Sequence, residues 1–391
     1  MTDLAVGVVG LGARSELGVL ADRPGQGSVV VAVCDNNPVF LERNGPRFPR
    51  ARRVADYREL FGAGLDAVII LTPDWTHEQI AVDFLAHGIA CFLEKPIAIT
   101  TAGCDRILST ARETGAPLYV GHNMRHMPVV TQMRDLIRSG AIGQVKTIWC
   151  RHFVGNGGDY YFKDWHSQRR YVNSLLLQKA AHDIDVIHWL AGAYTRKVSA
   201  FGELAVYGRV ADRRDHGGEL MQDWFSDDNW PPLAQRGLSP VIDVEDLSVV
   251  NMMLGNGVIA TYQQCHFTPD YWRNYTVIGT QGRIENFGDG GGGVIKLWNR
   301  RHGDFFPDGD ESYPIEEPEG THGGADPRLI SEFLAFVRGD VKATTSPVGA
   351  REAVATGCAA TDSLRAGGVL TEVPEPDPEV AAYFAAKTRE G

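Results

Sequence analysis

Short apolar segments alternate with helical stretches over the first 123 residues, and this alternation constrains the fold more than any other feature. Five segments have the β-branched, nearly uninterrupted apolar character of strands: LAVGVVG, SVVVAVCD, LDAVIILTP, IACFLEKP and APLYVGHN. Between the third and the fourth, THEQIAVDFLAHG places Ile80, Ala81, Phe84 and Leu85 on one helical face. Strands of this kind are buried on both faces, which predicts an α/β domain with a parallel sheet over residues 1–123.

The length, charge and cysteine pattern describe a globular chain with two domains. A chain of 391 residues has room for a second domain, which we expect over residues 124–391. The formal net charge of −11 argues against nucleic acid or an anionic membrane as a partner. Six scattered cysteines without a CxxC pair indicate buried, reduced thiols. The N-terminus lacks a basic leader and no apolar run reaches membrane-spanning length, so we expect a cytoplasmic protein.

The first predicted strand runs into a glycine-rich loop, GLGARS. Gly10 allows a tight turn and Gly12 lets the backbone approach a pyrophosphate, while Ser15 takes the third position of the dinucleotide-binding fingerprint. Asp35 ends the second strand, where the fingerprint places an acid that binds the ribose. A carboxylate at this position repels a 2′-phosphate, so the loop predicts NAD in preference to NADP.

The segment CFLEKPIAIT places Lys95 where the fourth strand leaves the core. Ligands of an open parallel sheet bind at the carboxyl ends of its strands, and Gly12, Asp35 and Thr72 are expected at the same edge. Lys95 would then face the nicotinamide end of a dinucleotide, where partial desolvation makes it useful as a proton acceptor or donor. The alternative is a solvated surface lysine paired with Glu94, and the residues alone leave both interpretations open.

A series of motifs resembles the Gfo/Idh/MocA oxidoreductase family. GLGARS and EKPIAIT are followed, in family order, by GHNMRHMP, GAIGQVKTIWCRHF, QKAAHDIDVIHWLAG, DVEDLSVVNMMLGNGVIATYQ and VIGTQGRIE. The resemblance implies a Rossmann domain that binds NAD(P), a C-terminal α+β domain with a large, open, mostly antiparallel sheet, and sugars or cyclitols as substrates. It also implies that Lys95 lies at the hydride-transfer site. The expected NAD contacts are Gly10, Gly12, Ala13, Arg14, Asp35, Asn36, Thr72, Pro73, His77, Glu94, Lys95 and Asn123.

The second domain is expected to supply an acid–base group from one helix over residues 175–192. His182 and Asp185 are three residues apart, share a helical face, and match the last two positions of the family's acid–small–His–Asp pattern. The acid position holds Gln178 instead, so the role of that carboxylate must move elsewhere or disappear. We assign His182 as the base because imidazole titrates near neutrality, with Lys95 donating to the substrate oxygen. The reverse assignment stays open.

Basic and aromatic residues around this helix suggest an anionic sugar as the substrate. Lys179 follows the altered position, and Arg169 and Arg170 lie upstream, where the alternative is that they are solvated loop residues. Tyr161 precedes them in an aromatic cluster and is a candidate base for an elimination. His322 could close over the substrate or cap a helix. The expected substrate contacts are Arg125, Trp165, Gln178, Lys179, His182, Asp185 and His322.

Three classes of function fit these features. The first is a sugar dehydrogenase, and the second is an NAD-dependent glycosidase, a variant known within the resembled family, in which transient oxidation of the ring permits elimination, water addition and re-reduction. The third, a dinucleotide-binding regulator without catalysis, is disfavoured by Lys95 and His182, while Gln178 gives some support to the second. We expect no metal, because His182, Asp185 and His188 do not form a zinc pattern.

Two further features concern the surface of the second domain. Residues 208–240 interrupt the strand pattern and contain Trp224, Phe225 and Trp230, which predicts an insertion that acts as a lid or a subunit contact. An open sheet with one uncovered face exposes more apolar surface than a monomer tolerates, so we expect a homodimer or a homotetramer.

Overall fold

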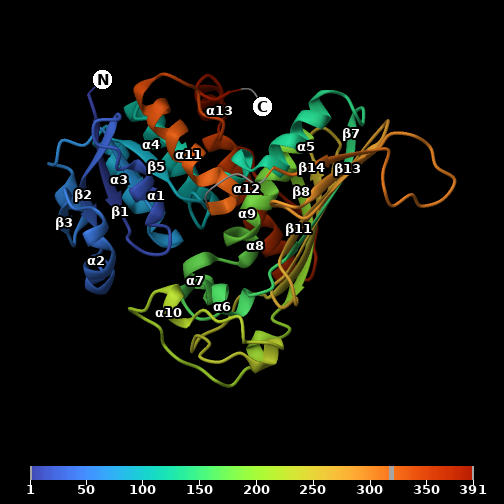
Figure 1. Cartoon of the computed structure of the whole chain (residues 1–391), viewed down its shortest axis with the longest axis horizontal. Helices are drawn as coiled ribbons and strands as arrows, with labels where there is room; N and C mark the ends of the chain where they lie inside the picture. The colour runs from blue at the N-terminus through green and yellow to red at the C-terminus, as the bar shows by residue number, and fades with distance from the viewer. Residues whose placement is uncertain (1, 317–320, 390–391) are drawn as a thin grey trace.

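Two β-sheets form the framework of the chain, which a computed structural model describes over residues 2–316 and 321–389 (Figure 1). Over these residues the first sheet has six strands, all parallel, in the order β3-β2-β1-β4-β5-β6. Its strands are β1 (Leu4–Val9), β2 (Ser28–Cys34), β3 (Arg52–Val54), β4 (Ala67–Ile70), β5 (Ala90–Leu93) and β6 (Leu118–Val120). The accompanying helices are α1 (Glu16–Ala21), α2 (Pro38–Asn44), α3 (His77–Ala86) and α4 (Thr101–Thr114). The predicted Rossmann fold is confirmed.

The second sheet is open and, over the same described residues, has nine strands in the order β14-β13-β12-β11-β7-β10-β9-β8-β15. Neighbouring strands are antiparallel except β7 and β10, which are parallel, so the predicted mostly antiparallel sheet is also confirmed. Its strands are β7 (Val145–Phe153), β8 (Thr195–Glu203), β9 (Leu247–Leu254), β10 (Ile259–Cys265), β11 (Trp272–Gly279), β12 (Arg283–Phe287), β13 (Val294–Trp298), β14 (Glu311–Pro314) and β15 (Thr371–Glu372).

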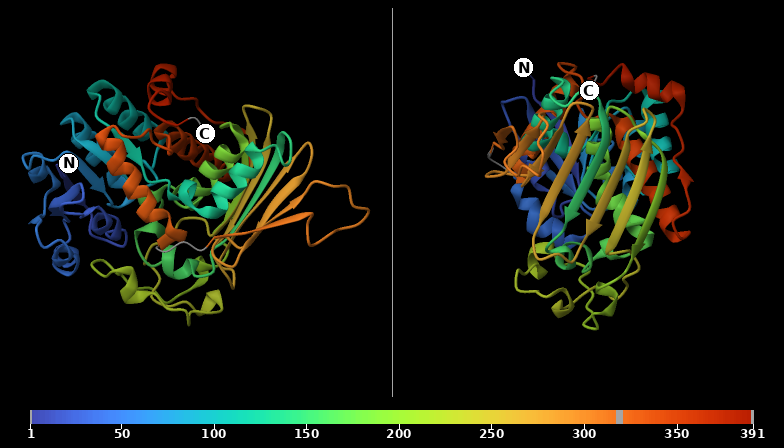
Figure 2. Two further views of the ribbon diagram at one scale, coloured as in Figure 1. Left: turned by 45° about the horizontal axis from the view of Figure 1, so that its top comes forward. Right: turned by 90° about the vertical axis from the view of Figure 1, so that its right-hand side faces the viewer.

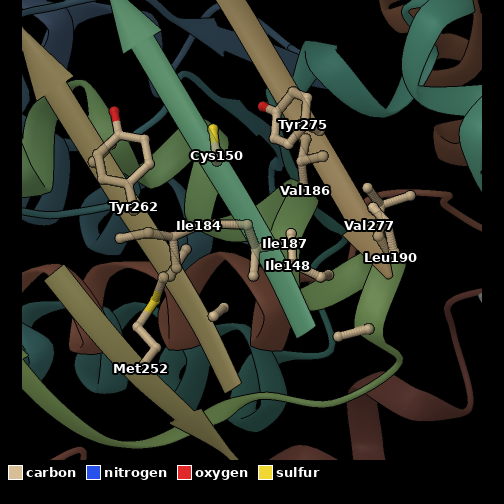
Figure 3. Packing of buried hydrophobic residues seen from close by; sticks show 14 of the residues in the cluster. Ile148, Cys150, Ile184, Val186, Ile187, Leu190, Met252, Tyr262, Tyr275 and Val277 are labelled. Atoms are coloured by element: carbon tan, nitrogen blue, oxygen red, sulfur yellow. The ribbon is translucent and has the colours of Figure 1, made fainter. Parts of the chain in front are cut away.

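Among the described residues, helices cover only one face of the second sheet (Figure 2). Those that share a buried cluster with its strands include α5 (Pro128–Arg138), α8 (Leu175–Gln178), α9 (Ala180–Ala191) and α12 (Pro347–Arg365). Figure 3 shows Ile184 and Ile187 of α9 packed against strand residues that include Ile148 and Val277, all in one buried cluster. The helix predicted over residues 175–192 is divided in two at Lys179, because α8 ends at Gln178 and α9 begins at Ala180.

The C-terminal helices return to the first sheet. Leu329 and Phe333 of α11 (Thr321–Arg338) share a buried cluster with Val6 and Phe92, which lie on β1 and β5. The last helix, α13 (Pro378–Ala385), contributes Phe384 to the cluster on the other face. Helices that follow the second sheet in the sequence, within residues 124–391, therefore help to cover the first sheet.

The segment between β8 and β9 forms an irregular layer along the lower edge of the molecule in Figure 1. It includes the short helix α10 (Met221–Trp224) and lies next to α6 (Gly157–Tyr161) and α7 (Arg169–Val172). Figure 2 shows from two further directions that this layer lies at one end of the second sheet. Within the described ranges, no helix combines the length and the apolar character that crossing a membrane requires.

Candidate active site

The glycine loop after β1 leaves room for a ligand on its outer side. Gly10 adopts φ +97°, and a Cβ there would lie 2.7 Å from the carbonyl carbon of Leu71, so only glycine fits. A Cβ on Gly12 would meet only Phe40, at 4.0 Å. Ala13 is exposed on the same loop. This arrangement fits the close approach of a dinucleotide pyrophosphate to the backbone.

Asp35 lies at the end of β2, as the ribose-binding position requires. Its Oδ2 accepts a hydrogen bond from the backbone N–H of Leu11 at 2.7 Å, and its Oδ1 accepts one from that of Asn37 at 2.8 Å. Burial raises the pKa of the carboxyl, and these two N–H groups oppose the rise. Each oxygen keeps a lone pair for a ribose hydroxyl, and Asn36 is exposed beside it. The residues therefore fit NAD.

The loop after β4 is tied to the loop after Lys95 through His77. The Nδ1 of His77 lies 2.7 Å from the backbone oxygen of Pro96, and its Nε2 lies 2.8 Å from that of Thr72. The ring is buried, so His77 holds the two loops together. Thr72 and Pro73 stay half-buried at the edge of the sheet, where a dinucleotide can reach them.

Lys95 lies half-buried between the two domains. Its Nζ donates to the backbone oxygen of Gln178 at 3.3 Å, which joins the end of β5 to the α8–α9 junction. The carboxylate of Glu94 accepts instead from the Nε of Arg14 and from the backbone N–H of Lys95, each at 2.7 Å. Burial lowers the pKa of Lys95, and the nearby carboxylates of Glu94 and Asp74 oppose that shift. Lys95 therefore lies where the end of β5 meets the second domain.

Two predicted cofactor contacts reach Asp326 of α11. Arg14 donates to its carboxylate through Nη1 at 2.9 Å and Nη2 at 3.1 Å, and Asn123 donates to it through Nδ2 at 3.2 Å. The Oδ1 of Asn123 is buried and has no hydrogen-bond partner among the described residues. Asn123 can therefore accept a hydrogen bond from a ligand, while Arg14 links the glycine loop to the C-terminal helix.

A cavity of about 260 Å³ brings together residues from distant parts of the chain. Its lining includes Asn123, Lys179, His182, Tyr271, Arg273 and Asp289. Burial lowers the pKa of His182 well below its usual value, and Lys95 and Lys179 lower it further, so its ring is neutral. The Nδ1 of His182 is buried without a partner among the described residues. A neutral imidazole with an unpartnered Nδ1 at the cavity wall can form a hydrogen bond with a ligand.

Lys179 is the cation of the cavity with the greatest capacity for a ligand. Within the described part of the chain, no hydrogen bond or ion pair engages its Nζ, which lies 5.4 Å from the centre of the Tyr161 ring. Burial lowers the pKa of Lys179 well below its usual value, and Arg273 and Lys95 add to the effect. An anion bound here would raise that pKa again and restore the positive charge.

Strand pairing in the second sheet brings charged side chains together beside the cavity, which Arg273 lines. His152 of β7 pairs with Arg273 of β11, and both side chains point to the helix-covered face. Asp183 of α9 forms an ion pair with Arg273, with Oδ1 3.0 Å from Nε, while its Oδ2 lies 2.9 Å from the Nδ1 of His152. The Oδ1 of Asp183 also accepts from the hydroxyl of Tyr275 at 2.5 Å. The nearby cations and donors lower the pKa of Asp183, so this carboxylate is ionised.

Other predicted substrate contacts are engaged elsewhere. Arg125 donates to Asp185 through Nε at 2.8 Å and Nη2 at 2.7 Å, and to the backbone oxygen of Thr344 at 3.1 Å. Asp185 therefore points toward Arg125 rather than along the face of His182. His188, which follows His182 and Asp185 along the helix, has its Nε2 2.8 Å from the hydroxyl of Thr195. Across the described residues, no group of three or more potential ligands is placed to hold a metal ion.

The aromatic candidates divide between the cavity and the domain boundary. Tyr161 is buried under Lys179, and burial raises the pKa of its hydroxyl. Trp165 stacks on His166 with ring centres 3.6 Å apart and meets Trp75 of the first domain edge-on at 5.2 Å. Trp165 thus contributes to the contact between the domains.

The basic segment before α8 is exposed and satisfied by nearby groups. Arg169 pairs with Glu245 at 2.7 Å, and Arg170 donates to the side chain of Gln168 at 2.9 Å. Neither arginine lines the cavity, whereas Arg273 does. The side chain of His322 lies outside the described residues.

Arg273, Tyr271, Asp289 and Asp183 are site residues that sequence reasoning missed. Arg273 had one usable signal, because it alternates with Tyr275 and Val277 along β11 on the buried face. A buried arginine in such a position needs a counter-charge or a ligand. Asp183 had no comparable signal, since it only stands next to the motif residue His182 in the sequence.

The fold and the cavity define a two-domain oxidoreductase with a Rossmann cofactor domain. Residues 4–122 match the family described as "Oxidoreductase family, NAD-binding Rossmann fold", and residues 130–285 match the family described as "GFO/IDH/MocA C-terminal domain". The chain belongs to the Gfo/Idh/MocA oxidoreductase family, and its cofactor is NAD.

Known proteins resemble the chain over different extents. YteT, named an oxidoreductase of Bacillus subtilis (strain 168), is 23% identical over 78% of this chain and 82% of its own length. The 2,7-anhydro-N-acetylneuraminate hydratase of Mediterraneibacter gnavus is 29% identical over 41% of this chain, which spans only 40% of that protein. A levoglucosan dehydrogenase solved with NADH and levoglucosan has the same fold, with a TM-score of 0.75 and 19% identity over 96% of this chain and all of the other.

Proposed function

We propose that this protein oxidises a ring carbinol of an anionic sugar or glycoside by transferring a hydride to NAD. The proposal is supported by two observations: the Nζ of Lys95 donates to the backbone oxygen of Gln178, four residues before His182, and the charge of Lys95 adds to burial in lowering the pKa of His182, which lines the cavity. A conserved architecture alone does not specify chemistry, so the proposal rests on these two groups and their surroundings.

His182 and Lys95 divide the proton chemistry between them. NAD, when bound, supplies the acceptor for the hydride. His182 is neutral and takes the proton of the carbinol hydroxyl, while the Nζ of Lys95 donates a hydrogen bond to the same oxygen and stabilises it. The opposite division, with Lys95 as the base, is supported by the lowered pKa of Lys95. Gln178 holds Lys95 through its backbone, which needs no carboxylate.

The charges around Lys179 favour an anionic substrate. Arg273 is shared between Asp183 at 3.0 Å and Asp289 at 3.9 Å, whereas Lys179 has no such partner in the described chain. A carboxylate or sulfonate on the sugar would pair with Lys179 and come within the field of Arg273. The cost of burying the ammonium group would then be offset by the bound anion.

A second candidate function is redox-neutral cleavage of a glycoside with NAD retained. A specific observation favours it: the ring of Tyr161, which carries a hydroxyl, lies 5.4 Å from the Nζ of Lys179 at the cavity, so the site has acid–base groups besides Lys95 and His182. After oxidation of one ring carbon, one of these groups takes the proton from the neighbouring carbon. The aglycone leaves as its alcohol, water adds, and the hydride returns to the ketone. The relative named a hydratase gives this candidate further support.

One experiment separates the two candidates. Purified protein is incubated with NAD and a panel of neutral, uronate and sulfonated glycosides, while NADH absorbance and aglycone release are followed together. Accumulation of NADH without aglycone release supports the dehydrogenase, and aglycone release without net NADH supports the glycosidase. Activity confined to neutral sugars contradicts the anionic substrate, and no turnover of any sugar contradicts the proposed chemistry as a whole.

A further inference from the structure

The insertion between β8 and β9 reaches across to the first domain. Arg43 on α2 donates to both carboxylate oxygens of Asp223 on α10, through Nη1 at 2.6 Å and Nη2 at 3.0 Å. The helix α2 begins at Pro38, directly after the loop that carries Asp35. Figure 1 shows the insertion extending from beneath α6 and α7 to the region of α2. The ion pair therefore connects the second domain to the helix that starts at the ribose end of the NAD site.

Asp223, the residue on the insertion side of this ion pair, is held in place by the structure around it. Asp223 also accepts a hydrogen bond from the backbone N–H of Leu220 at 2.8 Å, which fixes it in the first turn of α10. Trp224, the next residue, donates from its indole to the backbone oxygen of Asp159 at 3.1 Å. Its own backbone oxygen accepts from Lys163 Nζ at 3.0 Å. Arg43 therefore contacts a segment that these hydrogen bonds attach to the second domain.

The base of the insertion is anchored on a single buried carboxylate. Asp159 on α6 is 2% exposed, and its Oδ1 accepts from Lys163 at 2.6 Å and Asn229 at 2.9 Å. Its Oδ2 accepts from Gln235 at 2.6 Å. Asn229 and Gln235 belong to the insertion, while Asp159 and Lys163 belong to the body of the second domain. Since α6 also carries Tyr161, which lies under Lys179, the anchor is close to the substrate cavity.

We propose that the insertion is a strap that holds the two domains together across the cofactor cleft and slows the release of NAD. Release of a dinucleotide from a cleft between two domains requires the domains to separate, and the Arg43–Asp223 pair must break as they do so. The pair is bidentate, but its side chains are 39% and 29% exposed, so the expected contribution is modest and sensitive to salt.

The strap bears directly on the choice between the two proposed activities, although it rests only on NAD being the cofactor. A dehydrogenase must exchange NADH for NAD in every turnover, whereas redox-neutral cleavage is served by a cofactor that stays bound. Slow release would favour the second activity, and the measurement below needs no sugar.

The test is the rate at which bound NADH leaves the full-length protein, followed by fluorescence after a chase with excess NAD. We expect Asp223→Asn and Arg43→Gln each to speed release about two- to fivefold at low salt. The double variant Arg43→Asp with Asp223→Arg should restore release to within about twofold of wild type. High salt should accelerate release from the wild type and have less effect on either single variant.

A matched control and a second readout complete the experiment. Asp228→Asn changes an acid in the same insertion that lies away from Arg43, and it should leave release unchanged. Hydrogen exchange should show that NAD protects residues 219–230 in the wild type and less so in Arg43→Gln, a variant that leaves the insertion itself intact. Equal release rates in wild type, Asp223→Asn and Arg43→Gln overturn the strap. Failure of the wild type to bind NADH overturns the cofactor assignment instead.

Discussion

The two sheets of this protein differ in how their faces are covered. The first is parallel and covered on both sides, so residues of β1 and β4 such as Val6, Val8, Ile69 and Ile70 are fully buried. The second is covered on one side only, and its open face exposes large apolar side chains, including Trp149 at 44%, Ile259 at 55% and Met253 at 52%. The first sheet has both faces covered, in part by the C-terminal helices α11 and α13, whereas the second sheet leaves one apolar face exposed.

The charged groups on the two sides of the cleft differ in the same way. On the side of the first sheet, Arg14 forms ion pairs with both Glu94 and Asp326. On the side of the second sheet, Lys179 has no ion-pair partner in the described chain, and Arg273 is shared between two acids. The side of the first sheet, which we call the first wall, has its charged groups already paired, and this suits NAD, the ligand that does not change. The side of the second sheet, the second wall, has a cation without an ion-pair partner among the described residues, and this suits the substrate.

Removal of Lys95 should have the largest effect, because it tests whether the first wall does chemistry. We expect Lys95→Met to lower turnover by about two to four orders of magnitude while NADH affinity stays within about twofold. His182→Ala should behave similarly, and the double variant should lose less than the product of the two, as residues acting in one unit do. The exposed Lys146→Met is the control. Near-normal turnover in Lys95→Met would leave the proton chemistry unassigned.

A charge on the open face should separate the subunits of the expected homodimer or homotetramer. Glutamate at Ile278 or Trp149 would be buried in a two-fold interface at least twice, which should raise the dissociation constant by about a hundredfold or more. Light scattering and sedimentation measure the change. The same substitution at Leu233, which is 58% exposed but lies in the insertion, is the matched control. A wild-type protein that is monomeric at micromolar concentration would contradict the oligomer.

Loss of Lys179 should affect an anionic sugar far more than a neutral one. We expect Lys179→Met to raise KM for the anionic substrate about ten- to a hundredfold, the range for a hydrogen bond to a charged group, and to change KM for its neutral analogue little. Because burial lowers the pKa of Lys179, binding of the anion should take up a proton, so affinity in the wild type should fall as pH rises. An equal rise of KM for both sugars would contradict the pairing of a substrate anion with Lys179.

Substitution of Asp35 should give the smallest effect, confined to cofactor choice in the first wall. We expect the wild type to bind NAD more tightly than NADP, and Asp35→Ser to reduce that preference by about tenfold, because a like charge no longer opposes the 2′-phosphate. Fluorescence titration with NADH and NADPH measures the change. The reverse preference in the wild type would show that Asp35 does not face the ribose.

Much of the first domain could be predicted because its signals are local. Continuous apolar strands, a glycine forced to φ +97° at Gly10 and an acid at the end of β2 are each visible within a few residues. The parallel topology then brings the ends of these strands to one edge without further information. The strand β3 escaped prediction because Arg52 and Arg53 are exposed and only pairing with β2 makes the segment a strand.

The sequence by itself therefore determined the cofactor domain and the presence of an open second sheet, and it suggested Lys95 and His182 as candidates for the reactive groups. Only the tertiary structure decided which charges remain available to a substrate. Arg125 and Arg273 are both arginines near motif residues, yet Arg125 is paired with Asp185 and Arg273 lines the cavity. That difference depends on strand register and on which helix packs above it, contacts between residues far apart in the chain that no local pattern encodes.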